Sequence, residues 1–543
     1  MTLVKGFGLS TCVLFSGLVW GQSSAPEEGI PVNDALVIAK CGNCHTRDEH
    51  GNMQRISWER TTPEGWQEAL KRMILVNGVS LTPAEARAIV KYLSTSHGLA
   101  PEEAKPVMYD IERRIHQETS IPNDNVGHAC ARCHTFARAL SWRRSLDDWK
   151  QLADMHSTRY KLPLNEEAIA FLAKAAPLHT PEWDAWSARP HTPNLAGRWL
   201  VTASIQGRGK YYGELQVDAA GDEFSTSVHL TSVKDGSTIS RTGRSAIFGA
   251  YAWRGRSVGN EAASSAPDDL NSEAREVLWV APDQSTAEGR WFWGQYQEFG
   301  FDVKLRRASS DPTLIIVDPP SLKTGSEANR IRLIGDHLPA QVTPADLDLG
   351  PGVTVRRIVL RAPGEVVAEV DVASDAALGK RNVAFLGSVT PGAVAIYDRV
   401  DYIKVRPESA MAAFGDQTHA RGYQQFEAIG YQRGPDGKLH TADDVELGPL
   451  GANDVTWSIE VFYQAPGNST DFVGMVSPTG FFAPAADSPN NNFDVWVVAT
   501  AKNGKDKPLV GKSYMVVTVP MYTLNGRRYV RDLDRWIDDG PAQ

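Results

Sequence analysis

The spacing of apolar residues divides the chain into a helical N-terminal part and a longer β-rich part. Between residues 28 and 188, apolar positions such as Trp66 and Leu70 recur every three or four residues, which is typical of helices with one buried face. Thr62-Pro63-Glu64 predicts a helix start, and Thr82-Pro83-Ala84-Glu85 indicates a capping box before the next helix. We therefore expect a helical N-terminal domain.

Beyond residue 190 the apolar period changes to two, which predicts antiparallel β-structure. From residue 311 to 407, short strands recur at regular intervals between Gly, Pro, Asp and Ser, a pattern that favours an immunoglobulin-like sandwich. The segments 455–461 and 493–497 alternate cleanly and predict a second sandwich near the C-terminus.

The length of 543 residues corresponds to about three to four domains. The predicted fold class is multidomain, with an all-α domain followed by three all-β domains that form an antiparallel barrel or immunoglobulin-like sandwiches. The all-α domain is expected to contain two tandem modules, at about 28–100 and 101–190. The expected boundaries are 1–21 for a leader, 22–190 for the helical domain, 191–310, 311–407 and 408–543 for the β-domains.

Residues 1–21 resemble a secretory signal peptide, with one basic residue, Lys5, an apolar stretch from Phe7 to Trp20, and polar sequence from Gln22. A lipid-anchored Cys12 is the rival interpretation, but the residues after it remain apolar. No later segment is apolar for long enough to span a membrane, so we expect a periplasmic protein without membrane insertion. The formal charge of −9 becomes −10 without Lys5, because the leader has no acid, and this argues against nucleic acid as a partner.

Outside the leader, every cysteine belongs to one of two Cys-x-x-Cys-His motifs. They are Cys41-Gly-Asn-Cys44-His45 and Cys130-Ala-Arg-Cys133-His134. Two thiols at this spacing can form thioethers with the vinyl groups of one porphyrin, and the adjacent imidazole can then bind the iron. The motifs predict two covalently attached c-type haems, with His45 and His134 as proximal ligands. The alternatives are two disulfides or one four-cysteine zinc site, and neither explains the repeated histidine.

An internal repeat suggests the distal ligands. Each motif is followed by a helix that begins near a tryptophan and then by a second helix. When Trp66 is aligned with Trp149, Met73 falls opposite His156, seven residues after the tryptophan in both cases. Our hypothesis is that His45 and Met73 ligate one iron, and His134 and His156 the other. The remaining candidates are Met53, Met108, His116, His128 and Met155.

Other candidate chemistry is weaker. The loop from Asp436 to Asp444 places three carboxylates together, and either calcium binding or an ordinary solvated turn would account for it. Many of the 15 tryptophans lie in strand patterns, which indicates core packing. No spacing supports a Ser-His-Asp group, a phosphate loop or a metalloprotease helix.

The two haem motifs, the phrases TTPEGWQEALKRM and SLTPAEARAIVKYLS, and the order of four domains resemble the α subunit of quinohaemoprotein amine dehydrogenase. The resemblance implies a heterotrimer with a β-propeller subunit and a small subunit that carries a cysteine tryptophylquinone. That quinone oxidises primary amines, and the two haems pass the electrons to a periplasmic acceptor such as a blue copper protein or cytochrome c. By this resemblance the chain supplies electron transfer and has no catalytic residue for amine oxidation.

Three alternatives remain open from the sequence. A dihaem cytochrome c peroxidase would need one haem with a displaceable distal ligand. A dihaem subunit of another periplasmic dehydrogenase, such as one for alcohols, would have a different quinoprotein partner. The sandwiches could instead be adhesive or carbohydrate-binding modules with an accessory cytochrome.

Overall fold

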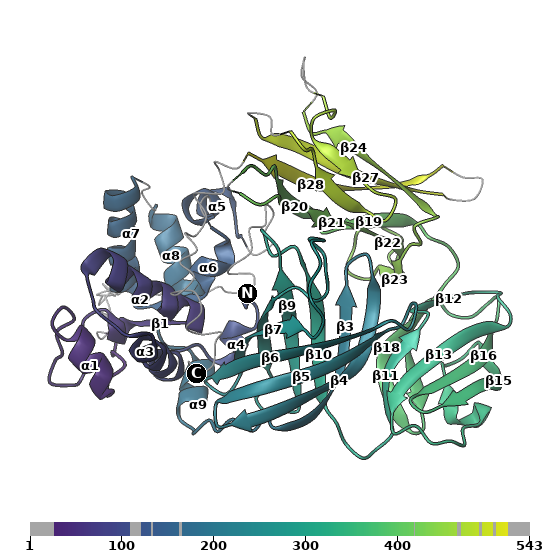
Figure 1. The fold of residues 1–543 in the computed structure, drawn as a ribbon, viewed down its shortest axis with the longest axis horizontal. Coiled ribbons are helices and arrows are strands. Elements are labelled where there is room, and N and C mark those ends of the chain that lie inside the picture. Colours follow the sequence, from purple (N-terminus) through teal and green to yellow (C-terminus); the bar gives the residue numbers. More distant parts are fainter. Residues whose placement is uncertain are drawn as a thin grey trace, which may run out of the picture.

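The computed structural model describes residues 27–108, 121–131, 134–161, 165–417, 419–463, 469–487, 491–502 and 507–519. The predicted leader, Cys133 and His116 lie outside these ranges, as do residues 520–543. In Figure 1 the helical region lies to the left of a barrel, and two further groups of strands lie above and to the right of that barrel.

The N-terminal region is helical, as the sequence predicts, but it also contains a two-stranded ribbon. Its helices are α1 (Ala35–Cys41), η1 (Ile56–Trp58), α2 (Pro63–Asn77), α3 (Pro83–Ser96), α4 (Pro101–Ala104), α5 (Asp124–Cys130), α6 (Phe136–Leu140), α7 (Leu146–Tyr160), α8 (Glu166–Ala175) and α9 (Pro181–Ser187). The ribbon pairs β1 (Glu59–Thr61) with β2 (Trp142–Arg144) in antiparallel fashion. The expectation of an all-α domain was therefore wrong in this detail.

The helix starts follow from the predicted caps. The Thr62 side chain accepts a hydrogen bond from the Gly65 backbone at the start of α2. Thr82 and Glu85 form the complete capping box at the start of α3. At the other end of α2, Gly78 adopts a left-handed conformation with φ 71°, which ends the helix without the strain that a Cβ would cause.

The ribbon joins two equivalent halves of the helical region. Adding 83 to the first and last residue numbers of α2 and β1 gives the first and last residue numbers of α7 and β2. Arg60 and Arg143, which correspond in this alignment, lie directly opposite one another in the ribbon. Trp66 donates a 2.9 Å hydrogen bond to the carbonyl of the residue that caps the end of α3, and Trp149 donates one of 3.2 Å to the equivalent carbonyl after α8. The sequence repeat is thus also a structural repeat.

A closed barrel of eight strands follows the helices. Its strands are β3 (Gly197–Ile205), β4 (Gly209–Ala220), β5 (Glu223–Ser232), β6 (Thr238–Phe248), β7 (Ala252–Gly259), β8 (Ala274–Val280), β9 (Thr286–Trp293) and β10 (Phe299–Arg307). Alternate residues point inward, and Trp199, Trp253, Trp291 and Phe301 fill the interior. This barrel is a packed core that holds its neighbours, because large side chains occupy its centre.

The next β-region consists of two packed sheets with a shared core. One sheet has the order β11-β13-β16-β15 and the other β12-β18-β17-β14, and residues such as Ile331, Val370 and Phe385 from both sheets form the core. The strands are β11 (Thr313–Asp318), β12 (Ser321–Lys323), β13 (Asn329–Asp336), β14 (Leu347–Asp348), β15 (Val353–Ala362), β16 (Glu365–Val372), β17 (Gly379–Phe385) and β18 (Ser388–Tyr397). A short turn, η2 (Pro344–Asp346), precedes β14.

The last β-region is built from three small sheets, with the orders β19-β22-β23, β20-β28-β27-β24 and β21-β26-β25. Its strands are β19 (Tyr402–Arg406), β20 (Ser409–Ala413), β21 (Gln424–Gln425), β22 (Glu427–Gln432), β23 (Val445–Pro449), β24 (Val455–Val461), β25 (Gly474–Val476), β26 (Phe481–Pro484), β27 (Phe493–Ala501) and β28 (Leu509–Thr518). The immunoglobulin-like assignment of the two C-terminal regions and the predicted domain boundaries stay predictions.

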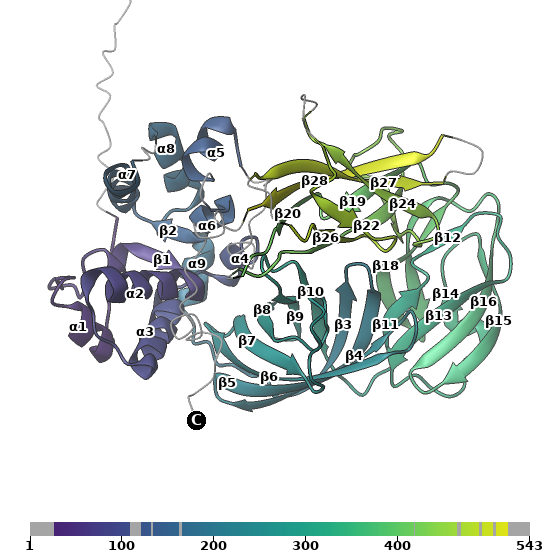
Figure 2. The ribbon, with the colours of Figure 1, turned by 45° about the horizontal axis from the view of Figure 1, so that its top comes forward.

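The barrel contacts every other part of the molecule, as both views show (Figures 1 and 2). Towards the next β-region, Arg198 of β3 pairs with Asp336 at 2.8 Å. Towards the last β-region, the backbone of Gly207 donates a 2.9 Å hydrogen bond to Glu427. Within the described residues, none of the helices has the length and apolar character needed to cross a membrane.

Candidate haem sites

The first motif lies at the end of α1 and in the turn that follows. Cys41 is the last residue of α1, and the backbone of His45 donates a 2.9 Å hydrogen bond to its carbonyl. This turn brings the two cysteines and the histidine together. His45 Nδ1 lies 2.8 Å from the carbonyl oxygen of Gln54, so Nδ1 carries the proton in that hydrogen bond and Nε2 is left for iron.

A short loop positions the Gln54 carbonyl. Arg47 and Met53 form an isolated antiparallel bridge, and the backbone of Gln54 donates a 2.9 Å hydrogen bond to the Thr46 carbonyl. Inside the loop, Asp48 accepts hydrogen bonds from the backbone of His50 and of residue 52, which closes the turn. The orientation of the first imidazole therefore depends on residues up to nine positions after it.

The second motif is more deeply buried. Cys130 ends α5 and is buried, and burial raises the pKa of its thiol to about 11. His134 Nδ1 lies 2.9 Å from the carbonyl oxygen of Thr135, its own neighbour. Burial, together with the nearby charges of Arg138 and His156, lowers the pKa of His134 to about 4. This imidazole is neutral at physiological pH, as an iron ligand must be. Cys133 lies outside the described residues.

The two predicted distal ligands occupy equivalent places in α2 and α7. Both side chains are half-buried, and Asn77 donates a 3.4 Å hydrogen bond to the Met73 sulfur. His156 Nδ1 lies 2.9 Å from the Leu152 carbonyl oxygen one turn earlier, which again leaves Nε2 for a metal. The ligand pairs themselves stay predictions.

The other candidates have different surroundings. Met53 is fully buried in the core that includes Trp66, and Met108 is also buried. His128 is exposed on α5, two residues before Cys130. Met155, beside His156, is half-buried and stays a rival.

The residues at the motifs suit covalent haem. Cys41, Cys44 and Cys130 are unpaired thiols, so they are available for thioethers. Within the described part of the chain, no three His, Cys, Asp or Glu side chains converge as a metal site. In the acidic loop, Asp444 accepts hydrogen bonds from the backbone of Gly434 and Thr441, as in a structural turn. The calcium interpretation gains no support.

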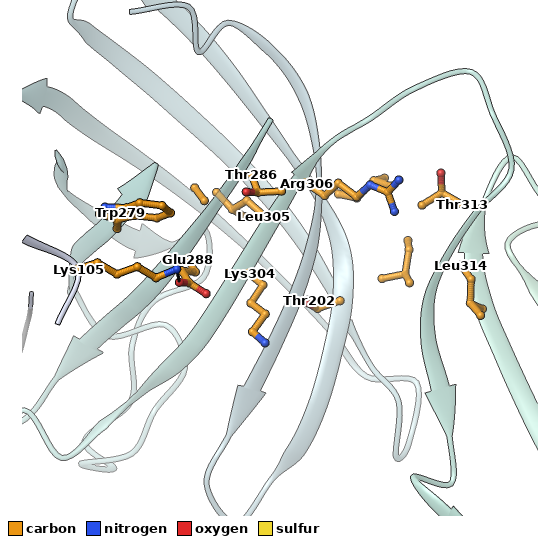
Figure 3. A pocket seen from close by; sticks show the side chains of 13 residues that line it. Lys105, Thr202, Trp279, Thr286, Glu288, Lys304, Leu305, Arg306, Thr313 and Leu314 are labelled. Atoms are coloured by element: carbon orange, nitrogen blue, oxygen red, sulfur yellow. Dashed lines mark ion pairs between the residues drawn. The ribbon is translucent and has the colours of Figure 1, made fainter. Parts of the chain in front are cut away.

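A separate cavity of about 340 Å³ lies on the outer wall of the barrel and contains none of the predicted haem residues. Figure 3 shows Lys105 reaching across Trp279 to Glu288, with Lys304 further along the same wall. The Lys105 ammonium lies 4.3 Å from the Trp279 ring and 2.5 Å from Glu288. These contacts attach the end of α4 to the barrel.

Four family models match successive parts of the chain. The first, described as quinohemoprotein amine dehydrogenase A, alpha subunit, haem binding, matches residues 32–170. Models for alpha subunit domains II, III and IV match residues 192–308, 311–398 and 403–526. The chain belongs to the quinohemoprotein amine dehydrogenase alpha-subunit family. It is a subunit of an oxidoreductase with a haem-binding domain and three β-domains, and membership in this family implies partner subunits.

No curated protein matches the chain significantly. Among solved structures, a redesigned β-barrel is 15% identical, covers 21% of this chain and 92% of its own, and has a TM-score of 0.18. Mouse cadherin-23 is 12% identical over 59% of this chain and 86% of its own, with a TM-score of 0.15. A glucan-utilisation protein of Bacteroides ovatus is 9% identical over 61% of this chain and 65% of its own, with a TM-score of 0.19. At these TM-scores the similarities carry no argument.

Sequence reasoning missed the residues that support the sites. The carbonyl of Gln54 has no signature in the sequence, because any residue provides one. The buried charges of Glu59, Arg144 and Asp148 join segments more than eighty residues apart. The offset of 83 that relates α2 to α7 was the one signal that could have placed β1 opposite β2.

Proposed function

We propose that this chain is the dihaem electron-transfer subunit of a periplasmic amine dehydrogenase. It receives electrons from a cysteine tryptophylquinone in a small partner subunit, where primary amines are oxidatively deaminated. It passes them to a periplasmic acceptor such as a blue copper protein or cytochrome c. The observation that carries the proposal is the pair of Cys-x-x-Cys-His motifs whose histidines both hold Nδ1 against a backbone carbonyl oxygen, within a chain of this family.

Each haem, when bound, supplies one-electron transfer at its iron. The protein's contribution is to hold and orient the ligands. The hydrogen bonds of His45 to Gln54 and of His134 to Thr135 fix the ring orientation and increase the basicity of Nε2. A thioether at Met73 would favour the reduced iron more than the imidazole of His156, so the two haems are expected to differ in potential.

The β-regions are the assembly surface in this proposal. They hold no predicted redox ligand, and they extend far from the helical region (Figure 1). We propose that a β-propeller subunit and the quinone-bearing subunit bind the chain as a heterotrimer. Export through the predicted signal peptide at residues 1–21 would deliver the chain to the periplasm, where c-type haem is attached.

The test uses the native complex, purified without oxygen. Addition of a primary amine should reduce the haems of this chain, as measured by the haem absorption bands, whereas an alcohol should not. A pyridine haemochrome assay should give two c-type haems per chain. No reduction by amines, combined with peroxide turnover by the isolated chain, would refute the proposal in favour of a peroxidase.

Paired variants show whether the electrons pass through this chain. His45→Ala removes a proximal ligand and should slow the amine-driven reduction of an added acceptor by more than roughly tenfold. His50→Ala changes an exposed histidine in the same loop and should leave the rate unchanged. Equal rates in both variants would show that electrons bypass the first haem.

A further inference from the structure

A cluster of buried charges lies on one face of the β1–β2 ribbon, between the two halves of the helical region. Glu59 and Arg144 lie directly opposite one another in the ribbon. Arg144 Nη1 donates hydrogen bonds to both Glu59 and Asp148, the latter from the first turn of α7. Arg55 closes the cluster, with its guanidinium 3.2 Å from Glu59 Oε1 and 3.7 Å from Asp148 Oδ1.

The two carboxyl groups form a pair that can share a proton. Glu59 is 8% exposed and Asp148 is 2% exposed. Arg144 Nη1 binds one oxygen of each carboxyl group, so these two oxygens lie close together and a shared proton would relieve the repulsion between the two negative charges. Burial and the charge of Glu59 raise the pKa of Asp148 to about 7, although Arg144 and Arg55 oppose the shift. Burial also acts on Glu59, but the charge of Arg144 keeps its pKa below the usual value.

The carboxylate on the opposite face of the ribbon does not titrate in the neutral pH range. On the opposite face of the ribbon, Arg60 and Arg143 both bind Glu103 of α4. These arginines lower the pKa of Glu103 to about 2 against the effect of burial, so it stays ionised. Glu27 has a pKa raised by burial, and the charge of His179 and backbone hydrogen bonds, including one from Leu146 of α7, limit the rise.

The carboxyl pair is joined to the second haem site by packing. The Arg144 guanidinium lies 4.3 Å from the ring of Trp142 and 5.5 Å from that of Trp149. Both tryptophans belong to the core that contains Cys130. Asp148 also precedes His156 by two turns of α7, about 12 Å along the helix axis at 1.5 Å per residue.

We propose that Glu59 and Asp148 form a proton-binding site whose affinity for a proton rises when the second haem is reduced, so that reduction draws protons from water. The inference rests on the proposed relay function. An electron delivered to this site would add one negative charge, and a roughly tenfold higher proton affinity would let the carboxyl pair take up at most about half a proton, which offsets part of that charge. When the electron leaves for the acceptor, the proton returns to water beside Arg55, whose side chain is 32% exposed.

The expected coupling between reduction of the second haem and proton binding by the carboxyl pair is large enough to measure. At the roughly 12 Å that separates Asp148 from His156 along α7, and at an effective dielectric constant of about 20, one added charge would increase the proton affinity of the pair roughly tenfold. Because the pair binds its proton more tightly in the reduced state, the potential of the second haem should fall as the pH rises through the neutral range. The potential of the first haem should depend less on pH.

The experiment is a spectroelectrochemical titration of the purified complex with chemical mediators between about pH 5.5 and 8.5. Asp148→Asn keeps the size of the side chain and removes its titration, so the pH dependence of the second haem should disappear. Asp147→Asn is the matched control, because Asp147 is the exposed neighbour in the same turn of α7. Reduction in weak buffer with a pH indicator should show proton uptake by the wild type and by Asp147→Asn only.

Glu59→Gln provides a second, independent variant. It leaves Asp148 with two arginines and no acidic neighbour, so its pKa should fall and the pH dependence should again disappear. An unchanged pH dependence in either variant with native haem spectra would overturn the proposal. Amine-driven reduction reports separately on the relay function, because the mediator titration needs neither the quinone nor the amine.

Discussion

At the scale of single residues, the histidines of the two Cys-x-x-Cys-His motifs are positioned by different means. His45 binds a carbonyl nine residues away, held by a closed loop, whereas His134 binds the carbonyl of the next residue. The distal candidates also differ in chemistry, with a sulfur at Met73 and an imidazole at His156. Haems bound at these two sites would thus have different potentials because of their immediate surroundings.

The assignment of the distal ligands can be tested through the sulfur atom of Met73. If Met73 binds iron, Met73→Leu should abolish the long-wavelength sulfur-to-iron charge-transfer band of the oxidised protein, because leucine offers no lone pair. His156→Ala should leave that band intact and change the spectrum of the other haem. Met475→Leu serves as the matched control, since that methionine is exposed in β25. A band that survives Met73→Leu and disappears in His156→Ala would reverse our assignment.

At the scale of secondary-structure elements, the ribbon and its charges hold the two halves of the helical region together. Arg60 and Arg143 lie opposite each other, and like charges in that arrangement repel. Glu103 compensates them, with oxygens 2.8 Å from Arg60 and 3.1 Å from Arg143. Thr180 donates a further 2.8 Å hydrogen bond to the same carboxylate.

Glu103→Gln should therefore destabilise the helical region by about 3 kcal/mol or more, because it leaves two buried arginines without a counter-charge. Glu102→Gln, on the exposed side of the same turn, should have little effect. The measurement is chemical denaturation followed by helical circular dichroism. Equal midpoints for the two variants would contradict this role.

The ion pairs of Glu103 with Arg60 and Arg143 also predict that the stability of the helical region depends on pH. The folded-state pKa of Glu103 is lowered from 4.5 to about 2, so its stabilisation is fully present above about pH 4.5 and is lost as the pH falls towards 2. Glu103→Gln should remove this part of the acid sensitivity, which acid titration followed by circular dichroism would measure.

The elements also show what sequence patterns can and cannot predict. The helix caps, the repeat and the alternating strands were predictable because neighbouring residues determine them. The ribbon was not, since the three-residue strands Glu59–Thr61 and Trp142–Arg144 have no alternation and form only through tertiary pairing. The motifs predict the haem-attachment residues, and that assignment stays a prediction, whereas the carboxyl pair of Glu59 and Asp148 has no sequence signature because it forms only on folding.

At the scale of the whole molecule, the barrel supports the first half of the helical region. Residues of β6 and β7 and the turn between them, including Phe248 and Tyr251, share a core with Trp66 of α2. The Tyr251 hydroxyl donates a 3.0 Å hydrogen bond to the Leu99 carbonyl, and Lys91 pairs with Asp222 at 2.6 Å. A module attached in this way cannot rotate freely relative to the barrel.

The centre of this interface is Glu64, in the first turn of the helix that carries Met73. Its carboxylate is buried and accepts hydrogen bonds from Arg254 and Arg275 of the barrel, the latter at 3.0 Å. These charges lower its pKa to about 2 although burial opposes the shift. The carboxylate of Glu64 neutralises the charges of two barrel arginines. Its loss should therefore weaken the attachment of the helical region to the barrel more than it weakens the folding of the helical region or of the barrel.

Glu64→Gln should therefore separate the thermal unfolding of the two parts. In this variant, the Soret-band circular dichroism of the helical region should disappear at a temperature several degrees lower than the temperature at which the barrel's tryptophan fluorescence changes. In the wild type, both signals should change at the same temperature. Glu182→Gln, an exposed residue of α9, is the matched control and should unfold like the wild type. If Glu64→Gln also unfolds in one step at an unchanged temperature, the shared apolar core alone fixes the haem module to the barrel.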